Sequence, residues 1–197
     1  MVDALRFRCT GCGNCCRNLR VAVTALDVRR LAAATGKAAS TLVEWLAPDA
    51  VDMSGEPESF VELSEGRRLM VLAQHDGACA LLDRDESCRA YAARPRDCRA
   101  YPFDFEPPPR QGSSKRRLAL LPLEGCEFAE DGDNDADELE AHDRLRFEEL
   151  ARYQAHVARW NRLAWHRRRL HQRVGAAREF LSFVGAAESD AADGAPT

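Results

Sequence analysis

The sequence predicts an α+β fold, in which a small irregular domain of short helices and a β-hairpin is followed by a long C-terminal helix. Three observations lead to this prediction. Helix-capping residues recur in the first fifty residues, two β-rich runs flank a polar turn at residues 64–67, and apolar residues recur at steps of three and four between residues 150 and 164. Hydrophobic residues make up 45% of the 197-residue chain, which is enough for a buried core.

The first predicted helix begins at Thr24, after a short extended segment at residues 20–23. Asp27 follows three residues later, where a carboxylate can accept a hydrogen bond from the helix start in a shorter version of the capping box. Gly36 is a natural C-cap, because glycine adopts the left-handed conformation without a steric penalty. We expect this helix to serve packing and not chemistry.

A second capping box is formed by Thr41 and Glu44. It predicts another short helix, which carries Leu42 and ends before Pro48 because proline cannot continue a helix. This helix is also expected to pack against the core.

Residues 60–63 and 68–72 flank the polar turn at 64–67, and this pattern predicts a β-hairpin. Residues 79–83 follow as a further short strand. The hairpin would lead the chain back toward its N-terminal part.

Downstream of the hairpin, Pro95 is placed to start a short helix, on which Cys98 would lie about one turn along. Residues 107–114 are rich in proline, glycine and serine and are expected to be a linker. Residues 117–121 could form another strand. These elements would complete the small domain.

The C-terminal part is divided by charge. Residues 124–143 contain ten Asp or Glu and no Lys or Arg, a net charge of -10, whereas residues 144–178 contain ten Arg against two Glu, a net charge of +8. The basic segment has helical periodicity and predicts the long helix. Residues 185–197 are small and polar and are expected to form a flexible tail.

Four cysteines lie within residues 9–16, at Cys9, Cys12, Cys15 and Cys16. Thiolates are soft ligands that suit zinc, copper(I) or iron–sulfur clusters, and a Cys-x-x-Cys step lets two sulfur atoms reach one metal from a single tight turn. Glycines at 11 and 13 would allow backbone N–H groups to turn toward the sulfur atoms. Adjacent side chains rarely reach the same ion, so Cys15 and Cys16 are expected to serve different centres or different roles.

Four further cysteines are spread over the following residues, which brings the total to eight. They are Cys79, Cys88, Cys98 and Cys126. Eight thiols are twice the four that hold a tetrahedral Zn²⁺ or one [4Fe–4S] cluster. Two centres, or one centre with spare thiols, are both compatible with this number, and the three-thiol run favours iron–sulfur slightly over zinc.

Charged residues and one histidine near these cysteines are secondary candidates. Arg94, Arg96 and Arg99 surround Cys98 and could balance the negative charge of a four-thiolate centre, or they could form a solvated turn. His75, four residues before Cys79, could act as a substitute ligand.

The joint pattern of these residues resembles the YkgJ-type cysteine-cluster family, a zinc- or iron-chelating CxxCxxCC domain. The resemblance rests on Cys-x-x-Cys-Gly-x-Cys-Cys at 9–16, Thr-x-x-Asp at 24–27, Cys-x-Leu-Leu-Asp at 79–83 and Cys-x-x-Tyr-x-x-Arg-Pro-x-x-Cys-Arg-x-Tyr-Pro-Phe at 88–103. A similar cluster is found in flagellin lysine N-methylases. The resemblance implies metal binding through Cys9, Cys12, Cys15, Cys16, Cys79, Cys88 and Cys98, and Cys126, beyond the tightest part of the match, is the eighth candidate ligand.

We therefore predict a metal-stabilised cysteine-cluster domain at residues 1–126, and an acidic loop with a long charged helix at 127–184 that packs on it or extends from it. The protein would hold an iron–sulfur cluster or zinc. Two alternatives stay open: an iron–sulfur-dependent oxidoreductase or protein-modifying enzyme, and an interaction module acting through the basic helix. No Ser/His/Asp arrangement or phosphate-binding glycine loop identifies a catalytic residue.

The expected location is the cytoplasm. No apolar stretch precedes Cys9, so a secretory signal is not expected, and no run approaches the ~18 apolar residues of a membrane helix. In a reducing compartment, clustered cysteines more often bind metal than form disulfides. No recognised nucleic-acid motif accompanies the basic segment, so nucleic acid is not an expected partner, whereas an unidentified protein partner is left open.

Overall fold

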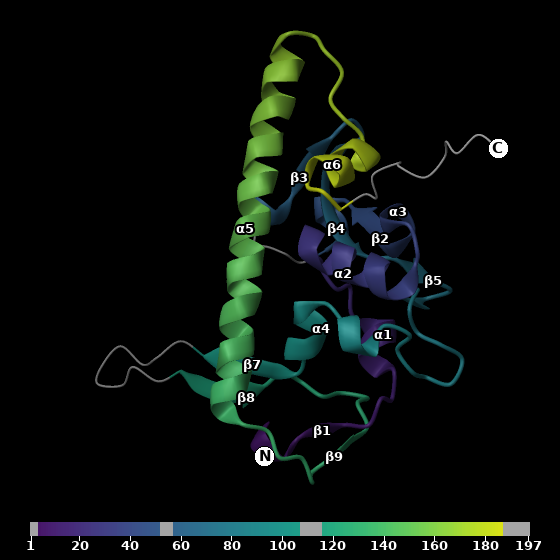
Figure 1. The fold of residues 1–197 in the computed structure, drawn as a ribbon, viewed down its shortest axis with the longest axis vertical. Helices are drawn as coiled ribbons and strands as arrows, with labels where there is room; N and C mark the ends of the chain where they lie inside the picture. The colour runs from purple at the N-terminus through teal and green to yellow at the C-terminus, as the bar shows by residue number, and fades with distance from the viewer. Residues whose placement is uncertain (1–3, 52–56, 107–115, 187–197) are drawn as a thin grey trace, which may run out of the picture.

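The structure is a computed structural model and describes residues 4–51, 57–106 and 116–186. Its long helix α5 runs along one side of the molecule, and the short helices and small antiparallel sheets lie beside it (Figure 1). The fold is the predicted mixture of α and β elements.

The helices are α1 (Asn14–Asn18), α2 (Ala25–Thr35), α3 (Ala39–Leu42), α4 (Arg96–Ala100), α5 (Ala136–Arg169) and α6 (Ala177–Phe183). The strands are β1 (Arg8–Cys9), β2 (Val43–Leu46), β3 (Val61–Leu63), β4 (Gly66–Leu72), β5 (Gln74–His75), β6 (Ala78–Cys79), β7 (Phe103–Glu106), β8 (Arg117–Leu120) and β9 (Phe128–Ala129).

One half of the molecule is built around the three-stranded sheet, in the order β2-β4-β3. Its main core combines apolar side chains from this sheet, from α2 and α3, and from the middle of α5. Phe180 of α6 is completely buried at the centre, where its ring makes edge contacts with Trp45, Tyr153 and Trp160 at centroid distances of 5.8, 6.2 and 5.4 Å. Elements far apart in the sequence are therefore joined by apolar packing.

The helix predicted from Thr24 is confirmed as α2. The Thr24 hydroxyl accepts from the backbone N–H of Asp27, and the Asp27 carboxylate accepts from the backbone N–H of Thr24 at 2.9 Å. Gly36 ends the helix with a φ of 65°. The extended segment before the helix lies against β4, with Ala22 bridging Val71.

The helix predicted from the second capping box is wrong. Helix α3 ends at Leu42, and residues 43–46 form β2, which pairs with β4 so that Trp45 lies opposite Met70. The Thr41 hydroxyl donates back to the carbonyl of Ala38 instead of capping a new helix. Backbone pairing with β4 and burial of the apolar side chains of β2 outweigh a local capping signal, as tertiary context often does.

The β-hairpin is confirmed as β3 and β4. These strands pair in an antiparallel register that sets Val61 opposite Arg68 and Leu63 opposite Gly66. The strand predicted at residues 79–83 is shorter than expected, because only Ala78–Cys79 pairs, with Gln74–His75.

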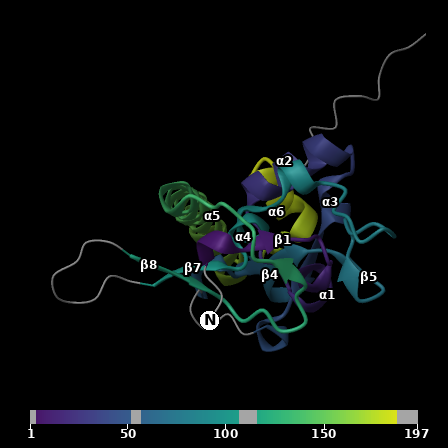
Figure 2. The same cartoon turned by 90° about the horizontal axis from the view of Figure 1, so that it is seen from below.

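The other half of the molecule is built from short elements. The predicted helix around Cys98 is confirmed as α4, preceded by Pro95 as its N-cap, and the strand predicted at 117–121 is β8. Strand β8 pairs with β7 (Figure 2), and β1 pairs with β9 (Figure 1). Neither pairing was predicted from the sequence. The linker predicted at 107–114 lies outside the described residues.

The long helix is confirmed, with different ends. It begins at Ala136 because the Asp135 carboxylate accepts from the backbone N–H groups of Asp137 and Glu138, at 2.8 and 3.0 Å. It ends at Arg169, and the chain then turns back into α6. Gly175 lies against the ring of Trp160, where a Cβ atom would come within 2.6 Å, so this return requires glycine.

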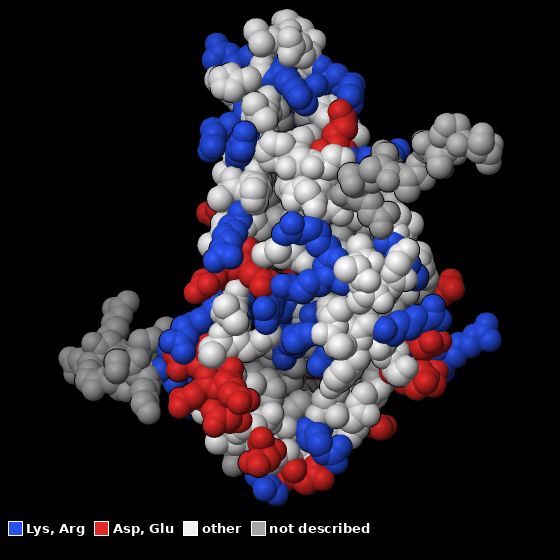
Figure 3. All heavy atoms as spheres, in the orientation of Figure 1, with Lys and Arg blue, Asp and Glu red and all other residues white. Residues whose placement is uncertain are grey.

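The charge pattern of the sequence is visible on the surface. In Figure 3, acidic side chains gather at the lower end of the molecule and basic ones at the far end of α5. Of the predicted flexible tail, Ala186 is described and buried, whereas residues 187–197 lie outside the described residues. Across the described ranges, no helix is long and apolar enough to cross a membrane.

Candidate metal centre

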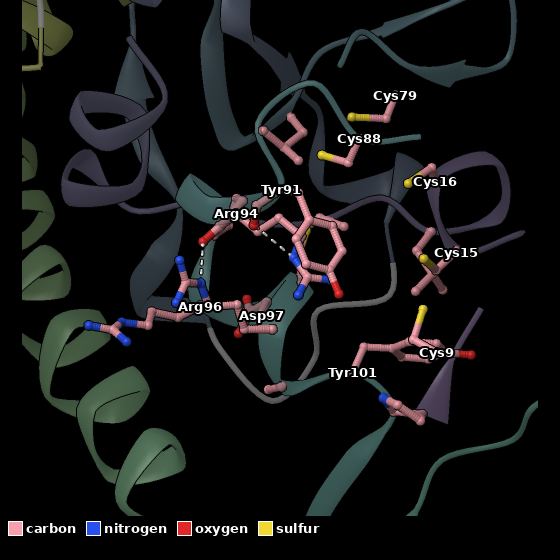
Figure 4. Close-up of a pocket in the computed structure, with 18 of the residues that line it drawn as sticks. Cys9, Cys15, Cys16, Cys79, Cys88, Tyr91, Arg94, Arg96, Asp97 and Tyr101 are labelled. Carbon is pink, nitrogen blue, oxygen red and sulfur yellow. Dashed lines mark hydrogen bonds between the residues drawn. The ribbon is translucent and has the colours of Figure 1, made fainter. Parts of the chain in front are cut away.

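The fold brings all eight predicted cysteines to one cavity. This cavity has a volume of about 1030 Å³ and opens between the two halves of the molecule. The thiols come from separate segments, several of which are visible in Figure 4. The cavity is lined by Cys9 of β1, Cys12 of the following loop, Cys15 and Cys16 of α1, Cys79 of β6, Cys88, Cys98 of α4 and Cys126. None of the eight is joined in a disulfide.

The backbone of residues 9–16 is shaped by its glycines. Gly11 and Gly13 have φ values of 77° and 70°, as expected from the spacing of the motif. The backbone N–H of Gly11 donates to the sulfur of Cys9 at 3.4 Å, so one predicted N–H···S contact is present. A Cβ atom at position 13 would lie 2.7 Å from the side chains of both Arg17 and Glu86, which form an ion pair there. Gly13 therefore provides conformational freedom and space.

Cys79, Cys88 and Cys98 are positioned by the main core. All three are half-buried and pack against its edge. The segment between the first two is closed by a β-bridge between Leu82 and Cys88 and by a hydrogen bond from the backbone N–H of Leu82 to the carbonyl of Cys79 at 2.9 Å. Burial raises the pKa of the Cys98 and Cys79 thiols, and neighbouring thiols raise the pKa of Cys98 further.

Cys126 reaches the cavity through the pairing of β1 with β9, in which Cys9 lies opposite Phe128. Two side-chain hydrogen bonds hold the same segments together, from the hydroxyl of Thr10 to the carbonyl of Glu127 at 2.5 Å and from the amide of Asn14 to the carbonyl of Glu124 at 3.0 Å. The sulfur atoms of Cys12 and Cys126 lie 4.0 Å apart. Burial and the neighbouring Cys12 raise the pKa of Cys126 to about 11.

Cys15 and Cys16 are adjacent on α1, and their thiols interact. A hydrogen bond from Cys16 stabilises the Cys15 thiolate and lowers the pKa of Cys15 to about 6. The same hydrogen bond, together with burial, raises the pKa of Cys16.

The three arginines near Cys98 have separate roles. All three line the cavity, and the charge of Arg94 contributes to the low pKa of Cys15. Arg96 pairs instead with Glu149 at 3.1 Å, and the guanidinium of Arg99 donates to backbone carbonyls of its own segment. Of the three, Arg94 is thus the arginine whose charge acts on the Cys15 thiol.

Two cavity residues and one nearby arginine had no assigned role in the sequence analysis. The ring of Tyr91 stacks on the guanidinium of Arg94 at 3.6 Å, and the Tyr101 hydroxyl donates to the carbonyl of Pro122 at 3.1 Å. Both tyrosines belong to the motif at 88–103, so the sequence contained a pattern that could have identified them. Arg17 pairs with Glu86 next to Gly13, and its hydrogen bond to Glu86 raises its pKa, with smaller contributions from the charges of Cys16 and Cys12.

His75 does not join the candidate site. Its side chain is exposed on β5, and it is not among the residues that line the cavity. Eight thiols, which are soft ligands, line the cavity together with six carboxylates.

The thiols surround the cavity without converging on one point. Within the described ranges, no group of three or more Cys, His, Asp or Glu side chains is placed to hold a metal ion as it stands. Binding of a single ion by four of these thiols would therefore require side-chain movement, which is common because thiol sites rarely preform without their metal. The donor set itself fits zinc or an iron–sulfur cluster.

The comparison with protein families decides the identity of this domain. Residues 8–127, more than half of the chain, match the CxxCxxCC family, described as a "Putative zinc- or iron-chelating domain". The chain belongs to the CxxCxxCC family. No curated protein and no solved structure matches the chain significantly. The CxxCxxCC match spans Cys9 to Cys126, and so it includes the eighth cysteine, which lies beyond the tightest part of the resemblance found in the sequence.

Proposed function

We propose that this protein holds an iron–sulfur cluster through its clustered cysteines. The observation that carries the proposal is that eight thiols from separate segments line one cavity of about 1030 Å³. A [4Fe–4S] cluster distributes four thiolates over four iron atoms, and it suits thiols that surround a volume better than thiols that touch one point. Family membership supports chelation of zinc or iron at this site.

The charges around the cavity support the same proposal. A [4Fe–4S]²⁺ cluster with four thiolates carries about two negative charges. The guanidinium groups of Arg94 and Arg17 lie close enough to the thiols to interact with their charges. These cations would lower the cost of placing the cluster in a half-buried site.

Anaerobic purification followed by measurement of iron, acid-labile sulfide and zinc tests this proposal. The expected result is about four iron atoms and as much sulfide for each occupied centre, with a broad visible absorbance that bleaches on reduction. A colourless protein that contains zinc and no sulfide would refute the iron–sulfur proposal and would leave the family's metal chelation intact.

Zinc is the second candidate because of one distance. Four thiolates at about 2.3 Å around a tetrahedral Zn²⁺ lie about 3.8 Å from one another. The sulfur atoms of Cys12 and Cys126, at 4.0 Å, are already close to this separation. Zinc without iron in protein purified in the absence of oxygen would favour this candidate.

An iron–sulfur-dependent oxidoreductase or protein-modifying enzyme is a further candidate, because the cavity continues past the thiols to Leu150 and Tyr153 of α5. Its volume reaches the upper end of the ~300–1000 Å³ typical of small-molecule sites. A redox titration of the loaded protein, with and without candidate protein substrates, would distinguish an enzyme from a metal-holding domain.

The basic part of α5 stays a predicted partner surface. Arg162 and Trp165 are exposed there, whereas Tyr153, Val157 and Trp160 of the same helix belong to the core. Deletion of the helix would therefore destroy the fold. Replacement of Arg162 and Trp165 alone tests partner binding while the core is kept.

A further inference from the structure

The thiols are distributed over two sides of the cavity. On one side, Cys79, Cys88 and Cys98 share an independent feature, because all three pack against the main hydrophobic core. Cys16 lies on this side in Figure 4, toward Cys79 and Cys88. These four cysteines are called the core-side set.

On the other side, the thiols belong to the segments that β1 and β9 hold together. Cys9 is itself in β1, opposite Phe128, and the sulfur atoms of Cys12 and Cys126 lie 4.0 Å apart. None of these three cysteines packs against the main core. The thiol of Cys126 is affected by the charges of Cys12, Cys9 and Cys15. These four cysteines, with Cys15 included, are called the strand-side set.

Helix α1 carries the two adjacent cysteines, Cys15 and Cys16, and one belongs to each set. Successive residues of an α-helix are rotated by about 100° around its axis, so Cys15 and Cys16 leave the helix in different directions, although their thiols are near enough to interact. Figure 4 shows Cys15 between Cys16 and Cys9, on the way to the strand side. The charge of Cys15 also reaches Cys79 and Cys98, which places this thiol near the boundary between the sets.

We propose that the eight thiols form two separate four-thiolate centres. The core-side centre uses Cys16, Cys79, Cys88 and Cys98, and the strand-side centre uses Cys9, Cys12, Cys15 and Cys126. Each centre takes a thiophilic metal group, an iron–sulfur cluster or a zinc ion, and the proposal rests on the proposed function only in requiring that metal is bound. Four thiolates complete the ligand shell of either group, so no thiol is left over.

Paired substitutions test this division. In anaerobically purified protein, Cys126→Ser is expected to remove the strand-side metal and Cys88→Ser the core-side metal, so that each single variant loses about half of the metal. The double variant Cys12→Ser with Cys126→Ser should lose no more than Cys126→Ser alone, because both thiols serve one centre. Cys88→Ser with Cys126→Ser should lose all bound metal. The readouts are metal and sulfide per chain, with Mössbauer spectra of ⁵⁷Fe-grown protein.

The outcomes separate the two proposals. Wild-type protein that contains only zinc refutes the iron–sulfur proposal, yet the pattern of losses still tests the division. Wild-type protein with metal in one centre only, or equal losses for the Cys12/Cys126 and Cys88/Cys126 double variants, overturns the division whichever metal is bound.

A second measurement uses the unmodified protein and does not depend on variant folding. A chelator removes metal in steps while an alkylating reagent labels released thiols, and fragmentation of the peptide that contains residues 15 and 16 locates each label. We expect Cys15 to become reactive together with Cys9, Cys12 and Cys126, and Cys16 together with Cys79, Cys88 and Cys98. Simultaneous release of Cys15 and Cys16, or release of Cys16 with Cys126, overturns the division.

Discussion

The two halves of this molecule are held together in different ways. The half around the β2-β4-β3 sheet buries large apolar side chains completely, among them Leu31, Val157 and Phe180. The cysteine-bearing region includes the two-residue strands β1, β6 and β9, and none of its eight thiols is fully buried. The first half can fold on apolar burial, the main driving force of folding. The second has too little buried apolar surface for this, and we infer that metal–thiolate bonds supply its stability.

Metal removal should have the largest effect, and it should destabilise the two halves unequally. Structural thiolate sites contribute about 10–16 kcal/mol to folding in small zinc peptides, so loss of metal should release the cysteine-bearing half. Hydrogen exchange should become fast at β1, β9 and α1 after chelation, whereas β2 and β4 stay protected. Equal loss of protection in both halves would show that the core depends on the metal as well.

Phe180→Ala tests the other half. Removal of a buried phenylalanine costs about 3–5 kcal/mol, and Phe180 has aromatic neighbours on several sides. Urea unfolding should show this loss, while folded protein keeps its metal. Phe147→Ala is the matched control, because Phe147 is 45% exposed and its loss should change the free energy of unfolding little. Equal effects of the two substitutions would contradict the assigned core.

Glu149 links the two halves, because its carboxylate pairs with Arg30 of α2 at 2.8 Å and with Arg96 of α4 at 3.1 Å. Glu149→Gln should lower the free energy of unfolding by about 1.5–3 kcal/mol, the range for hydrogen bonds to charged groups. Glu148→Gln is the control, since Glu148 is exposed and lies 3.9 Å from Arg152. If both substitutions change the free energy of unfolding in urea equally, Glu149 does not link the two halves.

The same carboxylate predicts a pH dependence. Burial raises the pKa of Glu149, but the hydrogen bonds and charges of Arg30 and Arg96 outweigh it, so the folded pKa lies below the usual value. Its contribution is therefore present above the unfolded pKa of about 4.3 and is lost as the pH falls through the folded pKa. Unfolding measured from pH 7 to pH 3 should show a smaller acid-dependent loss in Glu149→Gln than in wild type. Identical pH profiles would contradict this.

Tyr91→Ala should give the smallest effect. An exposed cation–π contact contributes about 0.5–1 kcal/mol, and Tyr91 is 56% exposed where it stacks on Arg94. Metal release to a chelator should be modestly faster, because Arg94 loses its support beside the thiols. Tyr91→Phe keeps the ring and should release metal as wild type does. Metal release from Tyr91→Ala as slow as from wild type would show that the Tyr91–Arg94 stack has no role at the cavity.

The parts of the fold that the sequence predicts are those with local causes. Thr24, Asp27 and Gly36 determine the ends of α2 through contacts within a few residues, and the turn between β3 and β4 is equally local. The helix predicted from Thr41 failed because β4, more than twenty residues away, offers β2 a complete set of backbone partners. Two-residue strands such as β1 and β9 have no periodicity that a sequence pattern could reveal.

The candidate site likewise has parts that the local sequence predicts and parts that depend on tertiary contacts. The spacing at 9–16 and the motif at 88–103 predict the participating thiols, and the structure brings all of them to the cavity. The position of Cys126 depends on the pairing of β1 with β9, which no local pattern indicates. The role of Arg96 likewise depends on helix α5, because Glu149 of α5 attracts its guanidinium away from the thiols.

The pairing of β1 with β9 has a consequence for synthesis of the protein. The strand-side thiols Cys9 and Cys126 are 117 positions apart, and the ribosome adds about 5–20 residues per second. For the proposed strand-side centre, the earliest cysteines therefore wait roughly 6–23 s before their last companion is made. During that interval the nascent chain exposes incomplete, reactive sulfur, so metal delivery to this protein has to follow translation or begin with a partial set of ligands.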